Sequence, residues 1–413
     1  MENVFLTGAL AHRPLLSVVL GETPDLIPAV LPGHDLRYSA SGPAPAAVPV
    51  ISPGAAAAVA GFLLTAPGQE AMARLSFFAA AMGYGETHRL VAAEGGALDP
   101  AAMGAGLNAG LTPAVSFEPT PAQKGAAPWQ QEVWAARWGA IATETAADVM
   151  AAQGALSAEA LAARRGSLLV RAASRLRAQE DKPATLRHDA QPGDVASLQR
   201  RIPYAHFFAV EDHLLRHRRF DGTESEPMER AVFVSCDAVV LLPYDPMRDR
   251  VLVIEQFRPG PWLRGDRNPW LLEAVAGRID AGETPEMAAR REAAEEAGLT
   301  LGRLIPGPSY YPSPGAKTEY IYSYLALADL PDGVAQPGGL EAEGEDIRAH
   351  LVGFDQLMEL AQSGEIDNAP LLVLVQFLAR ARAQLRAAAL VQQAEAGPAQ
   401  VAAGGSPAPA RRG

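Results

Sequence analysis

The sequence predicts a protein of mixed α+β and α/β class, built from two domains joined by a helical connector. Its 413 residues exceed the size of one ordinary domain, and 48% of them are apolar, which is enough for more than one core. Residues 120–190 are rich in alanine with apolar positions at helical spacing, whereas strand and helix patterns alternate from about residue 197. The expected parts are a front domain, a connector, a second domain and a disordered tail, at 1–115, 116–196, 197–389 and 390–413.

The first two parts carry strand signals and then helix signals. In the front domain, short apolar runs between turns predict strands at Val4–Leu6, Ala46–Ile51 and Phe62–Thr65, and a helix around Glu70–Met82. In the connector, tryptophans recur four or five residues apart, which predicts a packing stripe made of Trp129, Trp134 and Trp138. The charged segment 179–194 contains Pro and Gly and ends the helical pattern.

The second domain contains a hairpin signal. Apolar runs at Ala238–Leu242 and Val251–Gln256 flank the turn sequence PYDP. A further strand is expected at Glu319–Ala328, and helices at Phe354–Gly364 and Ala369–Ala389. The tail after these helices ends in AGPAQVAAGGSPAPARRG and has no core-forming content, so we expect it to be disordered.

Charge and composition exclude several classes of protein. The net charge of −12 argues against nucleic-acid binding, which needs a basic surface, but it is compatible with an anionic substrate bound through cations. We find no signal-peptide pattern and no long apolar run, so we expect no membrane partner. The single cysteine, Cys236, excludes a disulfide framework and indicates the reducing cytoplasm; its apolar surroundings predict that it is buried.

The segment Gly277–Leu299, GRIDAGETPEMAARREAAEEAGL, carries the strongest functional signal. Glu292, Glu295 and Glu296 are three or four residues apart and therefore share one face of a helix. Like charges on one face repel unless a cation neutralises them. Because oxygen-only ligands suit Mg²⁺ or Mn²⁺, which also bind phosphate oxygens, the segment predicts a divalent-metal site for diphosphate chemistry.

The residues around these glutamates fit a helix. Thr284 is suited to cap its N-terminus, Pro285 to occupy its first position, and Gly298 to end it. The alternative interpretation is a solvated acidic face whose charges are paired with Arg290 and Arg291. Composition alone would favour that alternative, so the spacing of the whole segment decides between the two.

That spacing resembles the Nudix box. Gly277 is followed by Glu283 and then by the run REAAEEAGL, with a small alanine in one hydrophobic slot. The resemblance implies a Nudix α/β/α sandwich with a mixed sheet, and hydrolysis of a nucleoside diphosphate linked to another group. The residues that it implies are Ala276, Glu292, Glu295 and Glu296 for Mg²⁺ or Mn²⁺, and Glu295 and Arg291 for catalysis.

Three further stretches resemble the ADP-ribose pyrophosphatase branch of that family. A proline lies sixteen residues after Gly298, a Gly-hinged acidic loop lies within the stretch 338–352, and the segment 201–273 resembles the front half of dimeric enzymes. The resemblance implies Glu343 as the catalytic base and, for substrate binding, Phe207, Arg230, Arg258, Pro314 and Glu319. The implied substrate class is a nucleoside diphosphate sugar, and the implied reaction splits ADP-ribose into AMP and ribose 5-phosphate in a homodimer.

The front domain resembles gamma-glutamylcyclotransferase-like (AIG2-like) domains over two short stretches. The run VFLTGAL resembles their anion-binding loop, but Thr7 and Ala9 replace its tyrosine and hydroxyl residue. The run LSFFAAAMGY resembles the segment of their catalytic glutamate, where Ala79 stands here. The resemblance implies a small β-barrel with helices that lacks a general base and the activity. A generic α+β module is the alternative; the domain order resembles that of tellurite-resistance type B proteins.

Two other functions stay open at this point. One keeps the metal site but changes the substrate to another nucleoside diphosphate derivative, such as a nucleotide sugar, or to an oxidised nucleoside triphosphate; the spacing of Pro314 and the matches at Phe207 and Arg230 argue against a triphosphate. The other is a ligand-sensing or stress-tolerance protein whose front domain binds a small amino-acid derivative. Ala79 favours binding without turnover in that case.

Overall fold

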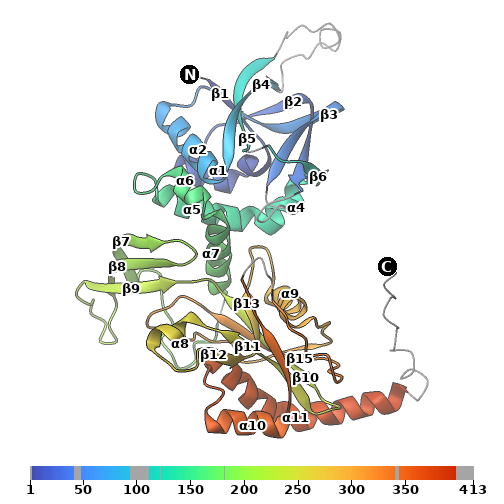
Figure 1. Cartoon of the computed structure of the whole chain (residues 1–413). Helices are drawn as coiled ribbons and strands as arrows, with labels where there is room; N and C mark the ends of the chain where they lie inside the picture. The colour runs from blue at the N-terminus through green and yellow to red at the C-terminus, as the bar shows by residue number, and fades with distance from the viewer. Residues whose placement is uncertain are drawn as a thin grey trace. The chain divides into compact units, whose positions relative to one another are not determined.

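The computed structural model (Figure 1) describes residues 2–40, 48–93, 111–120, 122–180, 182–339 and 344–396. The chain divides into two compact units. The first comprises Met1–Ala231 with Asp280–Gly282, and the second comprises Val232–Ile279 with Glu283–Gly413.

A closed β-barrel lies in the first unit. Its strands follow one another around the barrel as β3 (Pro49–Leu64), β1 (Asn3–Leu6), β5 (Thr112–Pro119), β4 (Tyr84–Ala93) and β2 (Ile27–Ser39), and β2 pairs back to β3. The short strand β6 (Gly125–Pro128) is added beside β2. Alternate residues of β1 serve two cores, because Phe5 joins the cluster shared by the barrel strands while Val4 and Leu6 pack with the helices.

Two predictions for this region need correction. Strand structure is present at 49–51 and 62–64, as expected within Ala46–Ile51 and Phe62–Thr65, but both stretches belong to the single strand β3, whose pairing with β2 continues along its length through one irregularity. The strands β5 and β6 extend into the segment 116–196, where we expected a helical connector. The strand at Val4–Leu6 and the helix at Glu70–Met82 are confirmed as β1 and α2 (Gln69–Ala81).

Helices of the first unit pack around one hydrophobic cluster. They are η1 (Gly8–Ala11), α1 (Arg13–Leu20), α2, α4 (Gln131–Trp134), the π-helical turn η3 (Ala135–Gly139), α5 (Ala140–Ala151), α6 (Ala158–Ala162) and α7 (Arg165–Ala178). Trp134 and Trp138 are 1% and 3% exposed within this cluster, and Trp129 packs against it. The predicted tryptophan packing stripe is therefore confirmed.

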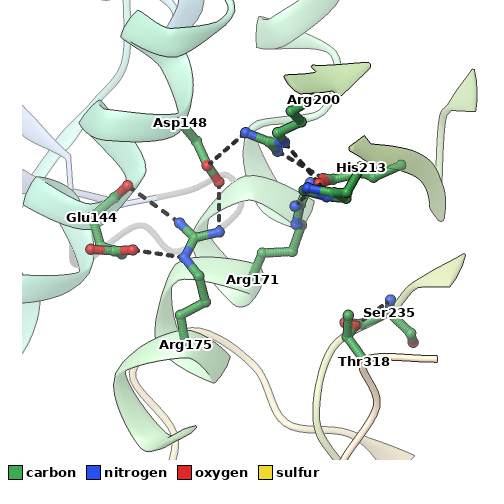
Figure 2. Close-up of polar contacts among 9 residues, drawn as sticks. Glu144, Asp148, Arg171, Arg175, Arg200, His213, Ser235 and Thr318 are labelled. Carbon is green, nitrogen blue, oxygen red and sulfur yellow. Dashed lines mark hydrogen bonds and ion pairs between the residues drawn. The ribbon is translucent and has the colours of Figure 1, made fainter. Parts of the chain in front are cut away.

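A three-stranded sheet follows, with the strand order β7 (Val195–Ala205), β8 (Ala209–His217) and β9 (Met228–Val234). Buried ion pairs tie its first two strands to α5 and α7 (Figure 2). Glu211, 4% exposed, accepts hydrogen bonds from Arg171 at 2.6 Å and from Arg200 at 2.7 Å. Arg175 extends the network by pairing with Glu144 and Asp148.

The second unit is built on a mixed sheet. Its strands are β10 (Ala238–Asp245), β11 (Arg250–Phe257), β12 (Trp270–Glu273), β13 (Val275–Arg278), β14 (Leu304–Pro306), β15 (Ile321–Leu327) and β16 (Arg348–Gly353). The pair β10–β15 is parallel, whereas β10–β11 is the antiparallel hairpin that the sequence predicted. Cys236, just before β10, is buried as expected.

Helices cover both faces of this sheet (Figure 1). Val239 and Leu241 of β10 pack with α9 (Pro285–Ala297), while Val240 and Leu242 pack with α10 (Phe354–Ser363) and α11 (Ala369–Ala396). This alternation is the period of two expected of a strand buried on both faces. The short helix α8 (Pro259–Arg264) follows β11. The unit is therefore the predicted α/β/α sandwich.

The helix α11 corrects one prediction about the tail. It continues to Ala396, so the beginning of the segment 390–413 is helical, because its Ala and Gln residues favour a helix. Residues 397–413 lie outside the described residues. Among the helices that the structure describes, none has both the length and the apolarity needed to cross a bilayer.

Candidate functional site

The helix α9 presents the acidic face, and its ends are formed as the sequence predicted. The Thr284 hydroxyl accepts a hydrogen bond from the N–H of Met287 at 3.2 Å, and Pro285 occupies the first turn. Gly298 has a left-handed φ of 62° and ends the helix. The two caps therefore define where α9 begins and ends, and the three glutamates lie in its last two turns.

Glu292 and Glu296 are the buried members of the acidic face. Glu296 is 3% exposed and Glu292 is 9% exposed, whereas the side chain of Glu295 is 32% exposed. Glu296 Oε2 accepts a hydrogen bond from the backbone N–H of Ala276 at 3.0 Å. Glu292 packs on Gly277, where a Cβ atom would lie 1.9 Å from its Oε1, so a side chain at position 277 would displace this carboxylate.

Arg291 organises these carboxylates. Its Nη1 donates to Glu292 at 2.7 Å and to Glu295 at 3.0 Å. Its Nε and Nη2 each donate to Glu283 at 3.0 Å, and Nη2 also bonds to the Arg278 carbonyl at 2.9 Å. Burial lowers the pKa of Arg291, but Glu283 and Glu292 more than offset this, so its pKa is raised. The guanidinium therefore holds the acidic face in place; a catalytic role for it stays a prediction.

The electrostatics of the acidic face favour a cation. Burial raises the pKa of Glu296 to about 8 and that of Glu292 to about 7. Glu345 contributes to raising both pKa values, while Arg291 lowers that of Glu292 and Arg258 lowers that of Glu296. In the described part of the chain no three His, Cys, Asp or Glu side chains already converge as metal ligands. The donor set nevertheless fits a divalent cation, because buried carboxylates outnumber the positive charges beside them.

The acidic loop is anchored beside the C-terminal end of α9. Gly338 and Ile347 exchange backbone hydrogen bonds of 3.0 and 3.3 Å at its base. The N–H of Gly339 bonds to the carbonyl of Glu295 at 3.4 Å. Glu343, the predicted catalytic base, lies outside the described residues. The described ends of the loop thus belong to the same region as the acidic face.

Arg258 is the one predicted substrate-binding arginine that the second unit contains. It follows β11 and pairs with Glu273 of β12. Burial lowers the pKa of Arg258, but Glu273, Glu296 and Glu345 raise it by a larger amount. Arg258 therefore lies near the acidic face, where a bound diphosphate would need positive charge.

The loop that carries Pro314 and Glu319 is held against the strand before β10. The Thr318 hydroxyl donates to the Ser235 carbonyl at 2.6 Å and accepts from the Ser235 N–H at 3.0 Å (Figure 2). Pro314 is exposed, and Glu319 pairs with Lys317 at 2.8 Å. Their substrate contacts stay predictions.

Phe207 and Arg230 belong to the first unit, whereas the acidic face belongs to the second. Phe207 lies in the turn between β7 and β8, where it is 62% exposed and meets Phe208 edge to face. Arg230 is exposed on β9, and its Nη1 bonds to the carbonyl of Glu229 at 2.8 Å. Both side chains are accessible to a ligand.

Two comparisons with known proteins decide the family. The NUDIX domain profile matches residues 235–374, which include α9 and most of the sheet below it. The ADP-ribose pyrophosphatase of Escherichia coli (strain K12) is 40% identical over 199 residues, which are 48% of this chain and 93% of that protein. The chain belongs to the Nudix family.

Other relatives of this Nudix protein act, by name, on two kinds of nucleotide sugar. The ADP-ribose pyrophosphatase of Haemophilus influenzae is 33% identical over 195 residues, 47% of this chain and 89% of that protein. The GDP-mannose pyrophosphatase of Enterobacter sp. (strain 638) is 33% identical over 150 residues, 36% of this chain and 77% of that protein. Nudix hydrolases use divalent metal ions such as Mg²⁺, in agreement with the charge of the acidic face.

Glu273 is the residue near the Nudix box that sequence reasoning did not single out. It is the last residue of a short strand, WLLE, and no motif marks it. The available signal was a carboxylate at the end of an apolar strand, directly before the box. That pattern is too common to assign a function without the pairing of β12 with β11.

Proposed function

We propose that this Nudix protein hydrolyses ADP-ribose to AMP and ribose 5-phosphate. The observation that carries the proposal is the 40% identity with an ADP-ribose pyrophosphatase along nearly all of that protein. The buried acidic face of α9, with Arg258 close to it, supports diphosphate chemistry at the same place.

Glu292, Glu295 and Glu296 would hold Mg²⁺ or Mn²⁺, with help from the carbonyl of Ala276. When bound, such an ion neutralises charge on the diphosphate and activates water for attack. The pKa of Glu296, raised to about 8, shows how unfavourable its charge is without a cation. Arg291 would keep the carboxylates oriented through its bonds to Glu292 and Glu295.

The residues of the chain would then divide the work of hydrolysis. Glu343 accepts a proton from the attacking water, whose oxygen forms the new bond to phosphorus as the bridging P–O bond breaks. Arg258 offsets negative charge on the phosphate oxygens. For the substrate, Phe207 would stack on adenine, and the remaining contacts would come from Arg230, Pro314 and Glu319.

A substrate panel tests the proposal. We expect the full chain with Mg²⁺ to give its highest kcat/KM with ADP-ribose, and far lower values with GDP-mannose and with 8-oxo-dGTP. A preference for GDP-mannose would favour the second candidate, a GDP-mannose pyrophosphatase, which the Enterobacter relative supports. Preference for the triphosphate would contradict both.

We further propose that the enzyme is a cytoplasmic homodimer that pairs through its second domain and the sheet before it. Exposed apolar side chains along β7 and its turn, Val195, Leu198, Tyr204 and Phe207, support an interface there. The single buried cysteine agrees with a reducing compartment. Light scattering of the full chain tests the pairing, and a monomeric mass would contradict it.

For the front unit we propose a cyclotransferase-like barrel without cyclotransferase activity. Ala79 is 1% exposed within the helix cluster and cannot accept a proton. The hydroxyl of Thr7 is already bonded to the carbonyl of Ala60 at 2.9 Å. Release of 5-oxoproline from gamma-glutamyl dipeptides by the full chain would contradict this proposal.

A further inference from the structure

Glu273 holds Arg258 by one edge of its guanidinium. Nε of Arg258 lies 3.1 and 3.2 Å from the two carboxylate oxygens of Glu273, and Nη2 lies 2.6 Å from Oε2. Glu273 is 7% exposed, and the side chain of Arg258 is 40% exposed. A forked contact of this kind fixes the plane of the guanidinium as well as its position.

The strands themselves bring the pair together. β11 and β12 are antiparallel, with Ile254 opposite Glu273, and the backbone N–H of Arg258 bonds to the carbonyl of Pro269 at 2.9 Å. Gln256, 6% exposed, adds a hydrogen bond of 3.3 Å from its side-chain amide to Glu273 Oε2. Glu273 is therefore held by the backbone pairing of β12 with β11 and by the side-chain amide of Gln256.

The opposite edge of the guanidinium has free donors. In the described part of the chain, Nη1 of Arg258 makes no hydrogen bond. Glu296 and Glu345 also raise the pKa of Arg258, so its charge is coupled to that of the acidic face. A guanidinium fixed along one edge presents its other edge to a ligand in one orientation.

We propose that Glu273 is a positioning residue: it fixes one edge of the Arg258 guanidinium and leaves Nη1 to bind a phosphate oxygen of the substrate. The inference rests on the proposed function, because it assigns Arg258 to a diphosphate. It adds a requirement that the Nudix box does not contain, namely a buried carboxylate on the strand before the box.

Binding of ADP tests the inference without hydrolysis. Dissociation constants for ADP and for AMP are measured by calorimetry with Mg²⁺ for the full chain and for E273Q, R258M and the double variant. We expect E273Q to weaken ADP binding about tenfold, the size of one lost charged hydrogen bond, with little change for AMP. In the R258M background the same substitution should change ADP binding less than twofold, since its target is gone.

Two further variants and two contradicting outcomes complete the test. E255Q is the matched control, because Glu255 is a carboxylate of the neighbouring β11 that pairs with His350 and not with Arg258; it should leave ADP binding unchanged. E273D replaces E273Q in the test if E273Q folds poorly. It keeps the charge and should retain part of the ADP affinity that E273Q loses. Equal loss from E273Q with and without Arg258, or no preference of the wild type for ADP over AMP, would overturn the inference. If ADP-ribose is not hydrolysed, but E273Q weakens ADP binding only when Arg258 is present, then the proposed reaction is wrong and the inference about Glu273 stands.

Discussion

Gly338 lies directly on the backbone carbonyl of Glu296. A Cβ atom at position 338 would be 1.9 Å from that oxygen, closer than any side chain can approach. Glu296 is in the last turns of α9, and Gly338 pairs with Ile347 at the base of the acidic loop. The absence of a side chain at position 338 thus sets the distance between α9 and the base of the acidic loop.

Replacement of Gly338 by alanine should therefore displace the acidic loop. Because the clashing atom is backbone, the loop must move as a whole. We expect kcat for ADP-ribose to fall about 10²-fold, the loss that a displacement of about 1 Å can cause at a reacting centre. G353A is the matched control, since no atom lies within 4 Å of its new methyl group. A G338A enzyme with kcat within twofold of wild type would show that catalysis does not depend on the close contact between Gly338 and the Glu296 carbonyl.

The buried charge of Glu296 predicts how stability depends on pH without metal. Its folded pKa, about 8, exceeds the ordinary value of 4.5, so the folded chain keeps a proton that the unfolded chain loses. Stability from this group is present below about 4.5 and is lost as the pH rises toward 8. In EDTA, we expect the Tm of the wild type to fall between pH 5.5 and 9, and that of E296Q to fall less.

Addition of Mg²⁺ to the same samples provides the second half of that test. The wild type should gain several degrees in Tm at pH 8, because the ion binds only the folded acidic face. E296Q should gain less. An equal increase in Tm on addition of Mg²⁺ to both proteins would show that Glu296 is not a metal ligand.

The buried charge of Glu211 predicts that stability falls as the pH falls, which is opposite to the dependence predicted from Glu296. Burial opposes its charge, but Arg200 and Arg171 lower the pKa of Glu211 from 4.5 to about 2. A depressed folded pKa stabilises the protein above pH 4.5, and this contribution disappears as the pH falls toward 2. E211Q should lose about 1.5–3 kcal/mol at pH 7, because the partly buried Arg171 and the more exposed Arg200 both lose a charged hydrogen-bond partner.

Urea unfolding of the full chain at pH 7 and pH 4 measures this loss. E229Q is the control on the same sheet, since Glu229 is 77% exposed and lies 3.6 Å from Arg201. Its effect should stay below about 1 kcal/mol. A loss from E211Q no larger than that of the control would mean that the ion network contributes little to stability.

Asp249 contributes to stability through its left-handed backbone conformation and through its charge. Two substitutions compare these contributions. Its φ of 56° is left-handed, and its carboxylate accepts from the Tyr244 hydroxyl at 2.8 Å and from Arg382 at 2.9 Å. Asparagine tolerates that backbone but lacks the charge, so D249N should cost about 1.5–3 kcal/mol. D249A should cost more, because alanine adds backbone strain. Unfolding free energies that are equal for the two variants would exclude the backbone contribution.

Several strands and helices of the sandwich could be predicted from their strong local signals, whereas the sandwich itself was implied by the resemblance to the Nudix box. Val239 to Leu242 are apolar without interruption, as a strand covered on both faces must be. The hairpin was also predicted, but its turn lies after Asp245, because PYD of the expected turn PYDP belongs to β10. The ends of α9 were equally clear from Thr284, Pro285 and Gly298. In each case the residue type acts locally, so no tertiary information was needed.

The barrel was harder because its long strands contain residues that usually end strands. β2 carries Pro28 and Pro32, followed by Gly33 with a left-handed φ, and the pairing with β3 shifts at that point. These residues split the pattern into pieces that look like turns. Glu273 was missed for a different reason: its importance depends on a partner, Arg258, that pairing of two strands brings to it.

The most direct test of the account is product analysis of ADP-ribose after incubation with the full chain and Mg²⁺. We predict that AMP and ribose 5-phosphate appear in equal amounts, and that EDTA or the substitution Glu296→Gln reduces both by at least about 10²-fold. Release of no AMP, or release that E296Q does not diminish, would contradict the assignment of this Nudix site to the diphosphate of ADP-ribose.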